Sequence, residues 1–151
     1  MTQPQDQPQR RIVVGVDGSG PSKAALAWAV RQAELTHAVV DAVIAWEFPS
    51  TYGLASLGDV DFQSIADQVI ADTITEMSGF PGQAGIHPHV VMANAVQALL
   101  DASAGAELLV VGNRGHGGFV GALLGSVSQH CLQHATCPVV VVRSAQHPSA
   151  P

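Results

Sequence analysis

Positive charge is scarce in this chain of 151 residues. One lysine and five arginines stand against 12 acidic residues, and the formal net charge is −6. Binding to a nucleic-acid backbone and docking on an anionic membrane both need clustered basic side chains. No stretch of the sequence is basic, so we expect neither nucleic acid nor a membrane surface as a partner.

Cysteine and long apolar runs are scarce too. Cys131 and Cys137 are the only cysteines, too few for a disulfide framework in a chain of this length. Residues 1–10 are polar and rich in Gln and Pro, without the apolar region of a secretory signal. No run is long enough to span a bilayer. The sequence therefore predicts a cytoplasmic protein, with residues 1–10 and 145–151 as disordered tails around one domain over 11–144.

Aromatic residues make up only 5% of the chain, so Ala, Val, Leu and Ile must fill the core. Short apolar runs rich in these residues predict strands, and those that do not alternate are typical of strands buried on both faces. A run that alternates and carries two histidines is expected to be an outer strand, and it is the third of the five. The runs are Ile12–Val16, Ala38–Trp46, Ile86–Met92, Leu108–Val111 and Val139–Val142.

Apolar residues at helical spacing lie between these runs. Pro21 suits the first turn of the first helix. Ser126 followed by Gln129 matches a capping box, in which the two side chains satisfy free amides at the start of the last helix. The predicted helices are Pro21–Leu35, Val60–Met77, Asn94–Ser103 and Ser126–Ala135.

Strands and helices thus alternate over residues 11–144. This alternation predicts a single-domain α/β fold with a doubly wound, open, parallel five-stranded sheet and helices on both faces. We expect the strand order 3-2-1-4-5. The first and fourth strands are then neighbours where the winding reverses, and ligands of such sheets bind beyond the carboxyl ends of these strands.

A glycine-rich segment, Gly112 to Gly125, separates the fourth strand from the last helix. Glycines let backbone amides approach a ligand closely, and a helix N-terminus attracts anions, so the segment predicts a phosphate cradle that also offers Arg114 and His116. The spacing fits neither a Walker A motif nor a dinucleotide fingerprint. The alternative is a loop that only turns the chain.

Asp17 follows the first strand and is expected to face the same crevice. Its carboxylate could accept bonds from ribose hydroxyls or coordinate a cation on the phosphates. The alternative is that it closes an Asx-turn before the first helix. A Ser126–His116–Asp17 triad has no G-x-S-x-G elbow to support it, and phosphoryl transfer usually adds a lysine and further carboxylates. We therefore predict that the site binds a phosphate-bearing ligand without cleaving it, and we predict no catalytic residue.

Histidine pairs give a weaker pattern. His130 and His134 stand four residues apart on the last helix, which is the spacing of a metal pair, but no third ligand stands out. His87 and His89 share one face of a strand. Solvated surfaces explain both pairs, and no metal site is predicted.

The pattern Gly112-x2-Gly115-x9-Gly125-Ser126 resembles the G-x2-G-x9-G-S/T motif of nucleotide-binding universal stress proteins. The opening Val-Gly-Val-Asp-Gly-Ser at 14–19, the strand Leu-Leu-Val-Val-Gly at 108–112 and the ending Cys-Pro-Val-Val-Val-Val at 137–142 add to the resemblance, which covers residues 11–143. One departure is Ala-Asn-Ala at 93–95, where many members have Gly-x-Pro.

The resemblance implies that the chain binds ATP, alone or with Mg²⁺. Trp46 falls where the family places an apolar residue against the base, and its indole either stacks on adenine or belongs to the core. Together with the two polar side chains of the loop, the expected binding residues are Gly15, Val16, Asp17, Trp46, Val111, Gly112, Arg114, Gly115, His116, Gly125, Ser126, Val127 and Ser128.

A regulatory binding module for the stress response is the function that the resemblance implies. The alternatives are a slow ATPase or adenylyl-transfer enzyme, an AMP- or cAMP-binding protein, and an interaction protein with an empty cleft. Val139–Val142 would leave an apolar strand unpaired at the sheet edge, and we expect a homodimer to cover it. An unidentified protein partner would recognise the nucleotide-bound form.

Overall fold

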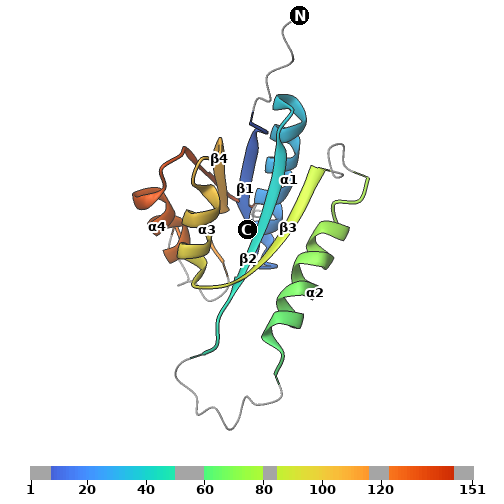
Figure 1. Ribbon diagram of the computed structural model, residues 1–151, viewed down its shortest axis with the longest axis vertical. Coiled ribbons are helices and arrows are strands. Elements are labelled where there is room, and N and C mark those ends of the chain that lie inside the picture. Colours follow the sequence, from blue (N-terminus) through green and yellow to red (C-terminus); the bar gives the residue numbers. More distant parts are fainter. Residues whose placement is uncertain (1–7, 50–59, 80–84, 116–122, 145–151) are drawn as a thin grey trace, which may run out of the picture.

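The computed structural model describes residues 8–49, 60–79, 85–115 and 123–144. Within them, strands and helices alternate as the sequence predicted (Figure 1). The elements are β1 (Arg11–Gly15), α1 (Gly20–Thr36), β2 (Val39–Trp46), α2 (Phe62–Thr75), β3 (Ile86–Met92), α3 (Ala95–Ser103), β4 (Leu108–Gly112), α4 (Ser126–His134) and β5 (Val139–Val142).

The strands form one parallel sheet in the order β3-β2-β1-β4-β5. The predicted α/β architecture and strand order are both confirmed. β3 is an outer strand, as expected, and β5 is the strand at the opposite edge. The winding reverses between β1 and β4, which are paired through Ile12–Leu108, Val13–Leu109 and Val14–Val110. The carboxyl ends of these two strands therefore share one edge of the sheet, where a ligand site is expected.

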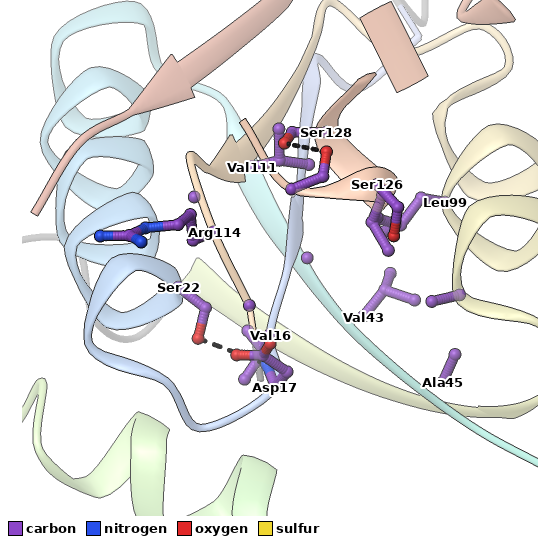
Figure 2. Close-up of a pocket in the computed structure, with 16 residues that line it drawn as sticks. Val16, Asp17, Ser22, Val43, Ala45, Leu99, Val111, Arg114, Ser126 and Ser128 are labelled. Carbon is purple, nitrogen blue, oxygen red and sulfur yellow. Dashed lines mark hydrogen bonds between the residues drawn. The ribbon is translucent and has the colours of Figure 1, made fainter. Parts of the chain in front are cut away.

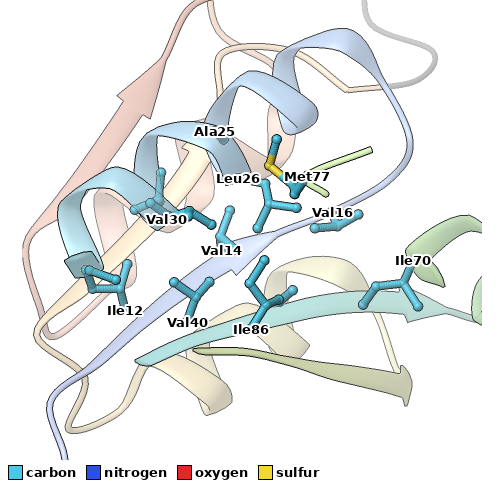
Figure 3. Packing of buried hydrophobic residues seen from close by; sticks show 14 of the residues in the cluster. Ile12, Val14, Val16, Ala25, Leu26, Val30, Val40, Ile70, Met77 and Ile86 are labelled. Carbon is cyan, nitrogen blue, oxygen red and sulfur yellow. The ribbon is translucent and has the colours of Figure 1, made fainter. Parts of the chain in front are cut away.

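Strand alternation sends side chains to the two faces of the sheet, and a separate core lies on each. Ile12 and Val14 of β1 pack with Leu26 and Val30 under α1, in a cluster that α2 extends (Figure 3). Val13 points to the other face, where α3 and α4 complete a smaller cluster. Complete burial of a Val, Leu or Ile side chain contributes roughly 1.5–3 kcal/mol. These two clusters fix the positions of β1 and β4, whose carboxyl ends line the site described below.

Helix ends show one departure from the sequence prediction. Ser19 caps α1 by accepting a hydrogen bond from the Ser22 amide, and Asn94 caps α3. The predicted capping box at the start of α4 is wrong. Gly125 is the N-cap, no side chain caps the helix, and Ser126 is already its first residue. The helix starts there because the Gly125 amide donates to the Asn113 carbonyl oxygen at 2.7 Å, which fixes the entry of the chain.

Two further expectations concern the predicted tails and the predicted lack of a membrane-spanning segment. Most of the predicted tails, residues 1–7 and 145–151, lie outside the described residues. In the described ranges, none of the helices combines the length and the apolar character needed to cross a bilayer.

Candidate functional site

A cavity of about 350 Å³ opens at the carboxyl ends of β1 and β4 (Figure 2). Residues from both strands, from β2 and from the first turns of α1, α3 and α4 form its walls. The lining residues are Gly15, Val16, Asp17, Ser22, Val43, Ala45, Ala95, Leu99, Val111, Gly112, Arg114, Gly115, Gly125, Ser126, Val127 and Ser128. The volume is typical of small-molecule sites.

All but two of the residues predicted from the sequence line this cavity. His116 lies outside the described residues. Trp46 is not a lining residue. It packs on the α1 and α2 face of the sheet, where its ring meets Phe48 edge to face at 5.3 Å, and Phe48 meets Phe62 of α2 at 5.7 Å. The position agrees with the core alternative for Trp46, because alternation along β2 turns it away from the cavity.

One side of the cavity is apolar. Val43 and Ala45 of β2 lie beside Leu99 of α3 in Figure 2, and Ala95 adds a further small side chain from the start of α3. Sequence analysis missed these residues and also Ser22. Val43 pairs with Gly15 in the sheet, so strand pairing brings it to the site, and no motif marks it. Aliphatic walls of this kind suit the flat face of a heterocyclic base.

The other part of the cavity is formed by the loop after β4 and the start of α4. Hydrogen bonds hold the two together: Gly125 N–H donates to the Asn113 carbonyl, and the Ser128 hydroxyl hydrogen is shared between the Asn113 and Gly125 carbonyls, with Oγ at 3.3 and 3.0 Å from them. The first amides of a helix have no partner within the helix. No side chain caps α4, so its first turn offers these amides to an anion in the cavity.

The three motif glycines differ in what a side chain at each position would meet. A Cβ on Gly112 would lie 2.7 Å from the carbonyl carbon of Pro21, so this glycine lets β4 approach the first turn of α1. A Cβ on Gly115 would lie 2.5 Å from Oδ2 of Asp17. A Cβ on Gly125 would have its nearest contact at 3.5 Å, on Arg114. Backbone packing therefore explains Gly112, whereas the obstacle at Gly115 is the end of the Asp17 side chain. At Gly125 there is no steric reason for glycine in the described chain.

Asp17 forms the turn before α1 and also lies in the wall of the cavity. Its Oδ1 accepts hydrogen bonds from the Ser19 N–H at 2.9 Å and from Ser19 Oγ at 2.5 Å, which makes the turn before α1. It also lines the cavity, with Oδ2 directed at Gly115 across the cleft. The turn therefore fixes the orientation of a carboxylate that belongs to the site.

A second group of polar side chains, within the described residues, surrounds Asp41. His89 Nε2 lies 3.1 Å and His87 Nδ1 3.8 Å from Oδ1 of Asp41, and Arg11 donates to Oδ2 at 3.0 Å. Burial raises the pKa of the Asp41 carboxyl, but the hydrogen bonds from Arg11 and His89 outweigh it, and the pKa lies below its ordinary value. Among the described residues, no three His, Cys, Asp or Glu side chains are arranged to hold a metal ion.

The other histidine pair lies on an exposed helix face, and one of the two cysteines is buried. The rings of His130 and His134 stack at 6.4 Å on the exposed face of α4. Cys131 is fully buried, and burial raises the pKa of its thiol. A thiol with a raised pKa is a poor nucleophile at neutral pH.

Comparison with known proteins identifies relatives of the chain as a whole. The model of the universal stress protein family matches residues 9–143. A universal stress protein of Mycobacterium tuberculosis is 37% identical over 139 residues, which cover 87% of this chain and 46% of the relative. A universal stress protein of Mycolicibacterium smegmatis is 36% identical over 144 residues, with 87% and 47% covered. This chain thus spans about half the length of these curated relatives.

Solved structures share the fold. UspA from Lactobacillus plantarum has a TM-score of 0.74 at 22% identity and covers 91% of this chain and 100% of its own. A universal stress protein crystallised in complex with cAMP has a TM-score of 0.59 at 26% identity, with 92% and 100% covered. The second of these holds an adenine nucleotide.

Proposed function

Because this chain belongs to the universal stress protein family, we propose that it is a cytoplasmic, ATP-binding regulatory module of the stress response. One observation carries the proposal. The glycine-rich loop, the uncapped start of α4 and the Asp17 carboxylate converge on one cavity with an aliphatic wall. Free amides and a helix N-terminus suit a phosphate chain, and the aliphatic wall suits a base.

The residues present fit the parts of ATP. Ser126, Val127 and Ser128 would direct amides to the phosphates, with Arg114 as the positive side chain nearby. Asp17 would accept a ribose hydroxyl or share a Mg²⁺ ion with the phosphates. Val43, Ala45 and the α3 side chains would hold the base. The cAMP complex of the relative supports an adenine nucleotide, and AMP or cAMP is the alternative ligand.

We propose binding rather than rapid catalysis. Among the described lining residues, Asp17 and Arg114 are the charged side chains. Efficient phosphoryl transfer relies on positioned metal ions, a cationic clamp and a group that orients the nucleophile. Slow ATP hydrolysis or adenylyl transfer is the alternative. In the presence of Mg²⁺, release of phosphate would identify hydrolysis and release of pyrophosphate would identify adenylyl transfer.

We further propose a homodimer through β5. In parallel strands, the N–H and C=O of one residue point to the same neighbour. The carbonyls of Pro138 and Val142 bond to β4, so Val139 and Val141 direct theirs outward. At the other edge, Ala93 bonds to Trp46 of β2, so Pro88 stands at an outward position and removes a donor there. One edge is thus blocked and the other is open to pairing with a second copy.

Titration calorimetry with ATP, AMP and cAMP, each with and without Mg²⁺, tests the proposal. We expect ATP to bind wild type, and Gly125→Val to weaken binding by placing a branched side chain in the cavity. Gly85→Val is the matched control, because a Cβ at Gly85 meets nothing within 4 Å. Absence of binding by all three nucleotides at millimolar concentration, or equal loss in both variants, would contradict the proposal.

A further inference from the structure

Ser22 is a buried wall residue of the cavity that no motif marks. Its exposed fraction is 4%, and it lies in the first turn of α1. Its Oγ accepts a hydrogen bond from the Asp17 N–H at 3.3 Å and donates to the Ser19 carbonyl at 3.0 Å. Figure 2 shows Ser22 directed at Asp17. The hydroxyl thus binds a backbone amide that lies outside the helix.

Ser19 holds the other end of Asp17. Its N–H and its Oγ both donate to Oδ1 of the carboxylate, and the same Oγ accepts from the Ser22 N–H at 3.3 Å. Ser22 therefore ties the main chain of Asp17, Ser19 ties its side chain, and the two serines are bonded to each other. These bonds orient the carboxylate with Oδ2 toward Gly115.

A simple capping role explains only part of this network. The cap of α1 needs the Ser19 side chain and the Ser22 amide, and the bond from Lys23 N–H to the Ser19 carbonyl continues the helix. Neither of these needs the Ser22 hydroxyl. Its bond to the Asp17 amide instead joins the helix to the residue that faces the ligand.

We propose that Ser22 is a positioning residue of the nucleotide site, which acts through Ser19 and Asp17 to hold the carboxylate in its binding orientation before the ligand arrives. The inference rests on the proposed function. A side chain that is ordered in advance loses less conformational freedom on binding, so preorganisation of this kind raises affinity.

A double-mutant cycle with Mg-ATP, followed by calorimetry, tests the assignment. Ser22→Ala removes the hydroxyl, and we expect a roughly fivefold weaker affinity, as for the loss of one neutral hydrogen bond. In an Asp17→Ala background the same change should have no further effect, because there is no carboxylate to position. If Ser22→Ala does not fold, Ser22→Cys keeps the volume and supplies a weaker hydrogen-bonding group.

A nucleotide-free measurement separates this inference from the proposed function. NMR coupling constants between Hα and Hβ of Asp17 should show one rotamer in wild type and averaging in Ser22→Ala. If wild type binds no ATP, the proposed function fails and this inference fails with it. If wild type binds but Ser22→Ala binds equally well, or loses the same factor with and without the carboxylate, or keeps one Asp17 rotamer, the inference alone is overturned.

Discussion

The carboxylate of Asp17 fills the space that a side chain on residue 115 would need, since its Oδ2 lies 2.5 Å from the Cβ position of Gly115. The φ of Gly115 is not positive, so its backbone conformation does not itself require glycine. The contact joins the turn after β1 to the loop after β4 across the mouth of the cavity. The second glycine of the motif is therefore linked sterically to the acidic residue of the other strand.

Gly115→Ala is expected to destabilise the fold by about 0.5–1.5 kcal/mol, because the end of the Asp17 side chain must shift and its hydrogen bonds to Ser19 are disturbed. Combined with Asp17→Ala, which removes the opposing oxygen, the cost should largely disappear. Urea denaturation without nucleotide measures both variants and the double variant. Equal destabilisation by Gly115→Ala in the two backgrounds would mean that Asp17 is not the group that excludes a side chain.

Gly125→Ser is expected to trade affinity for stability. Gly125 is the N-cap of α4 in an extended conformation, with φ −74° and ψ 168°, which suits a serine cap. The new hydroxyl should stabilise the helix by about a few tenths of a kcal/mol and compete with phosphate for the same amides. Gly125→Ala is the control, since it adds the Cβ without the oxygen. Tighter ATP binding by the serine variant than by the alanine variant would contradict this account of the cradle.

Asp41 is expected to make stability depend on acid. Its folded pKa lies below its ordinary value of 3.8, so its contribution is complete above about pH 5 and is lost as the pH falls through the folded pKa. Asp41→Asn should thus be less stable than wild type at pH 6, and the difference should shrink toward pH 3. Urea denaturation across this range tests the sign; a difference that grows on acidification would refute it. The titratable and charged groups that face Asp41 are His87, His89 and Arg11, and wild type and Asp41→Asn both contain them.

Val141→Pro is expected to dissociate the proposed dimer. It removes an outward N–H of β5 without touching the bonds to β4 that Pro138 and Val142 accept. Val141→Thr retains the N–H and serves as the control. Sedimentation equilibrium should show at least about tenfold weaker association for the proline variant alone. A monomeric wild type, or a proline variant that still dimerises, would argue against pairing through β5.

The fold could be predicted almost completely, because buried parallel strands leave short apolar runs and the intervening helices leave periodic ones. The glycine-rich loop and Asp17 could be recognised as site residues because glycines and an acidic residue stand directly after buried apolar strands. Val43, Ala45 and Leu99 carry no such mark, since ordinary core residues reach the cavity only through packing. Trp46 was ambiguous because the sequence does not say which face of β2 meets the cavity.

The capping box failed for a related reason. The pattern Ser126-x-x-Gln129 is local, but the start of α4 is set by the bond from Gly125 to Asn113, a residue on the far side of the glycine-rich loop. This contact across the loop makes Gly125 the N-cap, one residue before the Ser126 that the local pattern predicts. The uncapped first turn that results is the feature on which the proposed phosphate cradle depends.

An amide-resolved NMR titration of the wild-type protein with Mg-ATP would show whether the loop after β4 and the start of α4 contact the phosphates. We expect the largest shifts on Gly115, Ser126, Val127 and Ser128, with Asp17 also affected. Shifts confined to α2 and β3, or no shifts at saturating nucleotide, would show that the loop after β4 and the start of α4 do not hold the phosphates.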